Sequence, residues 1–121
     1  MNHRLSLGKI IEEYAVFYLI SLNYEILAQN WHSSAGEIDI LAYREEQYYF
    51  VEVRGRKIGS LVEACESLSF EKLERCELTA LVYLEKHPEI WDNWQLAFLS
   101  LSYDQYLQVL SINYEESLLG F

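Results

Sequence analysis

Residues 36–57, GEIDILAYREEQYYFVEVRGRK, constrain the fold of this chain more than any other stretch. In both halves, apolar and polar residues alternate with the period of two that a β-strand requires, and a polar run separates the halves. The stretch therefore predicts a β-hairpin. An even-numbered turn centred between Glu45 and Glu46 gives one face the following cross-strand pairs: Leu41 with Phe50, Asp39 with Glu52, and Glu37 with Arg54.

This predicted register brings two acidic side chains, Asp39 and Glu52, to the same place. Directly opposed Cβ atoms lie about 4.5–5.5 Å apart, so the two carboxylates repel each other unless a positive charge lies between them. Mg²⁺ is commonly held by one or two carboxylates, with water or phosphate oxygens completing its shell. We therefore expect Asp39 and Glu52 to bind Mg²⁺ or Mn²⁺. The alternatives are that both acids are solvated on an exposed face, or that an odd-numbered turn separates them.

The composition indicates a single domain, residues 1–121. A chain of 121 residues that is 51% hydrophobic can form one core and is too short for two ordinary domains. It has no signal-peptide pattern and no apolar run of about 18–20 residues, so we expect a cytoplasmic protein without membrane contact. Cys65 and Cys76 are too far apart in one predicted helix for a disulfide and are expected to be buried thiols.

The net charge of −10 argues against a broad nucleic-acid surface, because affinity for phosphates depends on Lys and Arg. A local surface is still compatible with the sequence, since Arg54, Arg56 and Lys57 cluster beside the proposed acids. We expect these three side chains to contact phosphates, with Arg56 on the opposite face of the strand from Arg54. The alternative is an exposed loop whose charge is balanced by neighbouring glutamates.

The segment before the hairpin predicts a helix over about residues 5–22 and a strand over 24–28. Glu12 lies on the flank of this helix, on a line with the small residues Gly8 and Ala15. These small residues would let that edge approach the sheet, so Glu12 could reach the rim of the site as a third carboxylate. The expected buried face of the helix is Leu7, Ile10, Ile11, Tyr14, Tyr18 and Leu22.

After the hairpin, the pattern predicts a helical region over about 61–86 and two strands over 94–99 and 105–112. Lys72 lies on the flank of the helix's apolar stripe, where it could lean toward the acids. Leu78, Leu81 and Val82 lie off that stripe, which indicates either burial by the last strands or a homodimer contact. This order of elements predicts an α/β sandwich with helices on both faces of the sheet.

The runs GEIDILA and FVEVRGR resemble the YraN-like family of small bacterial proteins, within the PD-(D/E)xK nuclease-like superfamily. The helical pattern Gly8, Glu12, Ala15 is similar to that family as well. The resemblance implies a three-layer α/β/α restriction endonuclease-like fold with a mixed central sheet. It also implies an Mg²⁺-dependent endonuclease that hydrolyses phosphodiester bonds in DNA or structured RNA. The catalytic residues it implies are Glu12, Asp39, Glu52 and Arg54, with the three acids as metal ligands and Lys72 joining the nucleic-acid contacts.

The main departure from the superfamily pattern is Arg54, which stands where most members have a lysine. An arginine can clamp a phosphate and stabilise charge, but with a pKa above about 12 it does not serve as a base. Two other functions therefore remain open: a catalytically inactive nuclease-like module that binds nucleic acid, and a protein-interaction module whose acidic surface meets a basic partner.

Overall fold

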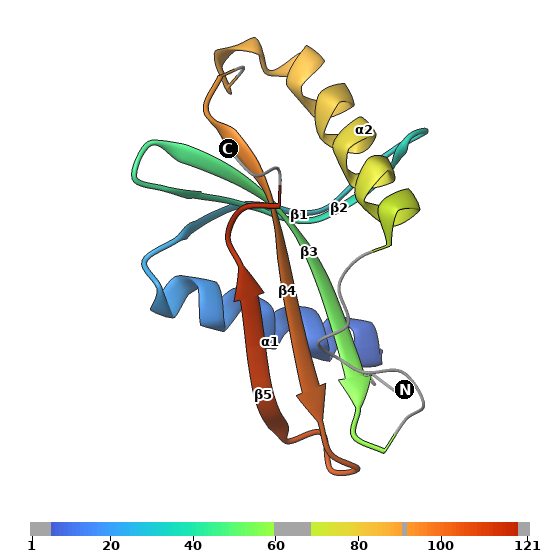
Figure 1. The fold of residues 1–121 in the computed structure, drawn as a ribbon. Coiled ribbons are helices and arrows are strands. Elements are labelled where there is room, and N and C mark those ends of the chain that lie inside the picture. Colours follow the sequence, from blue (N-terminus) through green and yellow to red (C-terminus); the bar gives the residue numbers. More distant parts are fainter. Residues whose placement is uncertain (1–5, 60–68, 91, 119–121) are drawn as a thin grey trace, which may run out of the picture.

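The computed structural model describes residues 6–59, 69–90 and 92–118, and its elements follow the expected order (Figure 1). The first half contains helix α1 (Leu7–Ser21) and strands β1 (Glu25–Ser33), β2 (Gly36–Arg44) and β3 (Gln47–Lys57). The second half contains helix α2 (Phe70–Lys86), the short 3-10 helix η1 (Pro88–Ile90) and strands β4 (Trp94–Tyr103) and β5 (Val109–Glu115).

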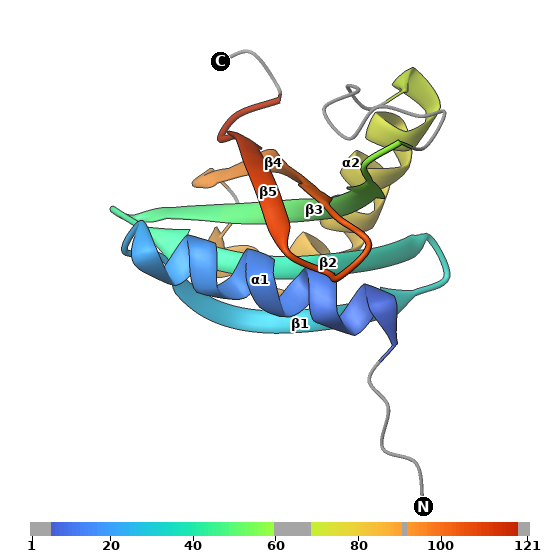
Figure 2. The ribbon, with the colours of Figure 1, turned by 90° about the horizontal axis from the view of Figure 1, so that it is seen from below.

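The strands form one mixed sheet in the order β1-β2-β3-β4-β5. The first three strands are antiparallel, β4 runs parallel to β3 after the α2 crossover, and β5 is antiparallel to β4. Helices α1 and α2 lie against opposite faces of the sheet (Figure 2). The expected three-layer α/β/α architecture with a mixed sheet is confirmed.

The β2–β3 hairpin has the register that its sequence predicts. Leu41 pairs with Phe50, and the turn consists of Glu45 and Glu46 with φ angles of 51° and 64°. Two successive residues with positive φ are typical of the two-residue turns whose twist matches that of the flanking strands. Because side chains alternate across a strand, the hairpin contributes to both hydrophobic cores: Ile40 and Val51 to the α1 side, Leu41 and Phe50 to the α2 side.

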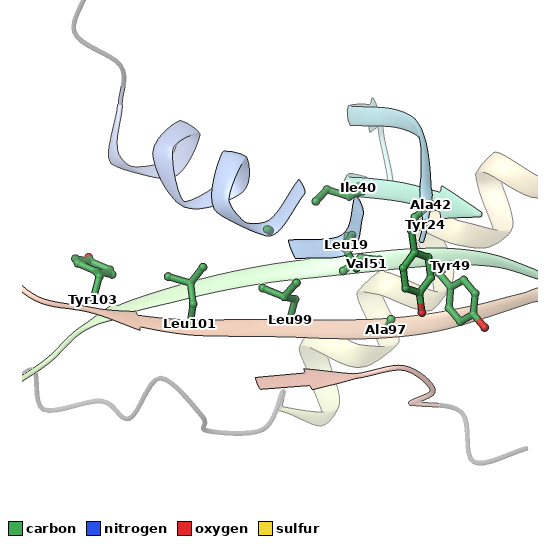
Figure 3. Close-up of a cluster of buried hydrophobic side chains, with 11 residues drawn as sticks. Leu19, Tyr24, Ile40, Ala42, Tyr49, Val51, Ala97, Leu99, Leu101 and Tyr103 are labelled. Atoms are coloured by element: carbon green, nitrogen blue, oxygen red, sulfur yellow. The ribbon is translucent and has the colours of Figure 1, made fainter. Parts of the chain in front are cut away.

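Helix α1 packs on the sheet through Ala15 and Leu19, which are both fully buried. Figure 3 shows Leu19 within this cluster of buried side chains. The expected buried face is wrong in part, because Leu7 and Tyr14 are 43% and 40% exposed. This helix carries apolar residues on nearly every side, so their spacing alone does not select the face that packs. The short side chain of Ala15 selects it instead, since it lets the helix approach the sheet on the line that also carries Glu12.

Other boundaries also differ from the sequence prediction. Strand β1 continues to Ser33, well beyond the strand expected over 24–28. The last strand begins at Val109 and ends at Glu115, later than expected. Cys76 is half-buried, and burial raises the pKa of its thiol to about 11, so it is an unreactive neutral group. Cys65 and the first part of the predicted helical region lie outside the described residues.

Two glycines allow the helices to approach the sheet closely. A Cβ atom added to Gly55 on β3 would lie 2.5 Å from Cδ1 of Ile11 on α1. A Cβ atom on Gly36 would lie 2.7 Å from Oγ1 of Thr79 on α2, and Gly36 has a φ of +149° that disfavours other residues. The Thr79 hydroxyl donates a hydrogen bond to the Arg75 carbonyl at 2.8 Å, which holds it in that place.

We predict that Gly36→Ala lowers the free energy of unfolding by about 1–3 kcal/mol, because the new methyl group meets Thr79 and the backbone is strained. Urea denaturation measures this change. The control is Gly8→Ala in the first turn of α1, where an added Cβ has no neighbour within 4 Å. That variant should be neutral or more stable by up to about 1 kcal/mol. Equal stabilities of the two variants would contradict the proposed close contact.

Candidate functional site

The candidate site lies where strands β2 and β3 separate. Their paired residues end at Ile40 and Val51, so the expected pairs Asp39–Glu52 and Glu37–Arg54 lie beyond the ladder. The Asp39 carboxylate fills part of this gap, since its Oδ2 accepts a hydrogen bond from the Val53 backbone N–H at 2.8 Å. A side chain thus takes the place of a backbone partner at this point in the sheet.

Asp39 and Glu52 line one cavity of about 230 Å³ on the α2 side of the sheet. Burial raises the pKa of Asp39, and the nearby negative charge of Glu52 raises it further, to about 8. Both effects disfavour the charged carboxylate in the absence of a bound cation. The structure therefore brings together the two acids that the hairpin register singled out, although they do not face each other in a regular ladder.

Helix α2 brings a positive charge to this acid pair. The Lys72 ammonium lies 3.1 Å from Oε2 of Glu52, and both residues line the same cavity. The helix begins after Ser69, whose hydroxyl accepts a hydrogen bond from the Lys72 backbone N–H, so Lys72 lies in the first turn. The expectation that Lys72 leans toward the site is confirmed. Its ammonium partly neutralises the acids and can bind a phosphate as well.

Glu12 lies on the other side of the sheet. It lines a second, larger cavity of about 550 Å³ together with Asn30, His32, Glu37 and Asp39. Asp39 borders both cavities, whereas Glu12 and Glu52 do not share one. Within the ranges 6–59, 69–90 and 92–118, no three acidic, histidine or cysteine side chains converge to form a metal-ion site. The structure thus pairs Asp39 with Glu52 and leaves Glu12 apart from that pair.

Sequence reasoning assigned no role to the side chain of Asn30. Its amide donates a hydrogen bond from Nδ2 to Oε1 of Glu12 at 2.9 Å, which links β1 to α1. Asn30 has a φ of 54° within strand β1, a conformation that asparagine tolerates better than most residues. An asparagine inside an otherwise strand-like run is the signal that could have marked this bend.

The predicted basic cluster extends along β3, and its details differ from expectation. The Arg54 guanidinium lies 5.7 Å from the ring centre of Phe98. Oε2 of Glu37 lies 3.7 Å from Nδ1 of His32, so Glu37 has a different neighbour from the expected Arg54. Because β3 continues without a bulge to Lys57, Arg56 is on the same face as Arg54, and the predicted opposite face is wrong. Lys57 is exposed at the end of the strand.

Arg75 was not singled out from the sequence. It lies three residues after Lys72, within one helical turn, and lines the cavity that contains Asp39 and Glu52. Its aliphatic stem lies over Gly36, with Cγ 3.6 Å from the position that a Cβ there would take. The helical spacing of Lys72 and Arg75 was available in the sequence, but the close packing of α2 on Gly36 was not.

A model of the Uncharacterised protein family UPF0102 matches residues 11–111, which include the hairpin and most of both helices. The chain belongs to the UPF0102 family. This confirms the YraN-like resemblance of the hairpin. Within the described residues of this UPF0102 member, neither α1 nor α2 is long and apolar enough to cross a membrane.

Several UPF0102 relatives are similar to this chain. A UPF0102 protein of Acinetobacter baumannii is 36% identical over 86 residues, 71% of this chain and 65% of that protein's length. One from Sulfurihydrogenibium is 39% identical over 80 residues, 66% of this chain and 70% of the relative. One from Dichelobacter nodosus is 42% identical over 80 residues, 66% of this chain and 64% of the relative. This chain thus matches just under two thirds of the Acinetobacter and Dichelobacter proteins.

We predict that Asp39→Asn raises the free energy of unfolding at pH 8 in the presence of a chelator, by at least about 1 kcal/mol. The folded protein holds a proton on Asp39 up to about pH 8, whereas the unfolded chain loses that proton above its usual pKa near 3.8. The stability contributed by Asp39 is therefore complete below about pH 4 and falls as the pH rises toward 8. The free energy of unfolding of Asp39→Asn does not fall in this way, because an amide has no carboxyl proton to lose. The amide oxygen can still accept the hydrogen bond from the Val53 N–H.

Chemical denaturation of both proteins from pH 4 to pH 8 measures the effect. The difference between them should be small near pH 4 and grow with pH. Parallel stability curves across the range would show that Asp39 has an ordinary pKa in the folded protein.

Proposed function

We propose that this protein is a metal-dependent phosphodiesterase that acts on nucleic acid, with Asp39 and Glu52 as ligands of Mg²⁺ or Mn²⁺. The observation that carries this proposal is the pair of adjacent carboxylates, which opens into a cavity that also receives the Lys72 ammonium. Acids placed this close and partly buried are disfavoured without a cation, and such arrangements are enriched at functional sites.

The residues present fit a hard divalent ion held by few protein ligands. Carboxylate oxygens are the donors that Mg²⁺ prefers, and Mg²⁺ normally keeps several water or phosphate oxygens in its shell. A cavity of about 230 Å³ beside the two acids leaves space for those oxygens. Thiol and imidazole groups do not compete for this role, because Cys76 is a neutral thiol and His32 lines the other cavity.

A bound ion would polarise a phosphate and lower the pKa of a water molecule at this site. The protein's own groups would bind the phosphate, stabilise its charge and position the metal ligands. Lys72, whose ammonium lies 3.1 Å from Glu52, would attract the phosphate. Arg54, two residues after Glu52 on the same face of β3, would stabilise the negative charge that builds up in the transition state. Val53 would hold Asp39 in place through its backbone N–H.

A second function is favoured by two specific observations. Glu12 lies apart from the acid pair and a lysine is absent from position 54, so the site offers only part of the arrangement implied by the nuclease resemblance. These departures suit a nuclease-like module that binds nucleic acid without cutting it. Metal-dependent cleavage distinguishes the two functions.

We predict that Mn²⁺ binds the protein and that Glu52→Gln weakens the binding at least tenfold, or about 1.4 kcal/mol. Isothermal titration calorimetry measures both affinities. The matched control is Glu13→Gln, which removes the same charge from an exposed position on α1. If Glu52→Gln and Glu13→Gln bind Mn²⁺ equally well, Glu52 is not a metal ligand.

A further prediction concerns Arg54. If Arg54 acts as an electrostatic clamp, Arg54→Lys keeps the charge and retains substantial metal-dependent cleavage, while Arg54→Ala loses about 10²–10³ in rate. The assay uses branched DNA, single-stranded DNA and structured RNA with Mg²⁺ and with Mn²⁺. An increase in cleavage on Arg54→Lys would instead indicate that the wild-type protein is a binder that lost its lysine.

No cleavage of any substrate by the wild type or by Arg54→Lys, with Mn²⁺ binding confirmed, would count against the nuclease function. It would favour the binding module. Circular dichroism of the Arg54 variants confirms that they are folded before their rates are compared.

A further inference from the structure

The two cavities that meet at Asp39 differ in charge. The larger one, on the α1 side, carries the acid Glu12 and the cation Lys9, while Glu37 and Asp39 border both cavities. The smaller one, on the α2 side, carries Glu52 together with the cations Lys72 and Arg75. The charged residues that belong to only one cavity leave one net positive charge on the α2 side and none on the α1 side. A phosphate backbone that approaches Asp39 is therefore attracted more strongly on the α2 side.

Arg75 is placed to bind a phosphate. Its side chain is exposed, and no ion pair or hydrogen bond of its guanidinium group occurs within the described parts of the chain. Lys72 lies one turn earlier on the same face of α2, and side chains three residues apart on a helix are neighbours. A planar guanidinium with free donors is well suited to the oxygens of a phosphate.

Strand β3 carries two further basic side chains after Glu52. Arg54 follows Glu52 on the same face, and Arg56 follows Arg54. Glu52 therefore has basic residues on two elements near it: Lys72 on α2, at 3.1 Å, and Arg54 two residues further along the same face of β3. Close packing of α2 on Gly36 sets the position of the basic residues on α2 relative to those on β3.

We propose that the nucleic-acid backbone crosses the α2 side of the sheet, from Arg75 past Lys72 to Arg54, and that Arg75 is a phosphate-binding residue. The larger α1-side cavity does not receive the backbone. This inference rests on the proposed function and deepens it, because it states which of the two openings at Asp39 faces the substrate.

The test compares Arg75→Gln with Lys9→Gln. Each variant removes one positive charge from a helix, next to one of the two cavities. Binding of fluorescein-labelled single-stranded DNA is measured by fluorescence anisotropy at several salt concentrations, with Ca²⁺ in place of Mg²⁺ to slow cleavage. Thermal unfolding of both variants and of Arg75→Lys verifies that each protein is folded.

We expect Arg75→Gln to weaken binding at least fivefold and to reduce the slope of log K against log salt by about 0.7, the value for one phosphate contact of a single strand. Arg75→Lys should keep most of the affinity, and Lys9→Gln should change it less than twofold. The inference is overturned if Lys9→Gln weakens binding as much as Arg75→Gln does, or if Arg75→Gln leaves affinity and slope unchanged.

Failure of this inference is distinguishable from failure of the proposed function. If Lys9→Gln weakens binding and Arg75→Gln does not, the substrate binds on the α1 side, and the proposed metal-dependent function is unaffected. A wild-type protein that binds neither single-stranded DNA, branched DNA nor structured RNA would overturn the nucleic-acid function and this inference with it. If Arg75→Gln weakens DNA binding while Glu52→Gln retains full Mn²⁺ affinity, the proposed DNA-binding surface is supported and the proposed metal site is wrong.

Discussion

The hydrogen bond from the Val53 backbone to the Asp39 carboxylate is the contact on which the rest of the site depends. In a regular hairpin, the backbones of both strands would pair with each other at this point. Here a side chain supplies the acceptor, so the strands separate without leaving the Val53 N–H unpaired in a partly buried place. The gap gives Asp39 access to both faces of the sheet, and each face contributes a different set of charged neighbours.

The parts of the structure that depend on local sequence could be predicted. The hairpin register follows from alternation and from a two-residue turn, and both are properties of adjacent residues. The mixed sheet follows from the order of helices and strands, since a helix between two neighbouring strands usually makes them parallel. Most of the apolar stripe of α2 is also correctly predicted, because its polar residues leave one clear apolar face, but Leu81, which was expected off the stripe, packs in the core as well.

The parts that depend on tertiary contacts could not be predicted from local patterns. A period of two continues through Asp39 in the sequence, so nothing there shows that the ladder stops at Ile40. The positive φ of Asn30 and its bond to Glu12 require that β1 bend toward α1. The approach of α2 that brings Lys72 and Arg75 to the acids depends on contact with Gly36, which is distant in the sequence.

The parallel pairing of β3 with β4 has a consequence for the order in which the site is assembled. Glu52 has β2 on one side, which is joined to β3 by a tight turn, and its other neighbour, Phe98, comes only after α2 in the chain. Contacts between residues close in sequence form faster than those that must close a long loop. The acid pair is therefore expected to be assembled early with the hairpin, whereas Lys72 and β4 reach it late, so the nascent hairpin holds two acids before their cationic partner arrives.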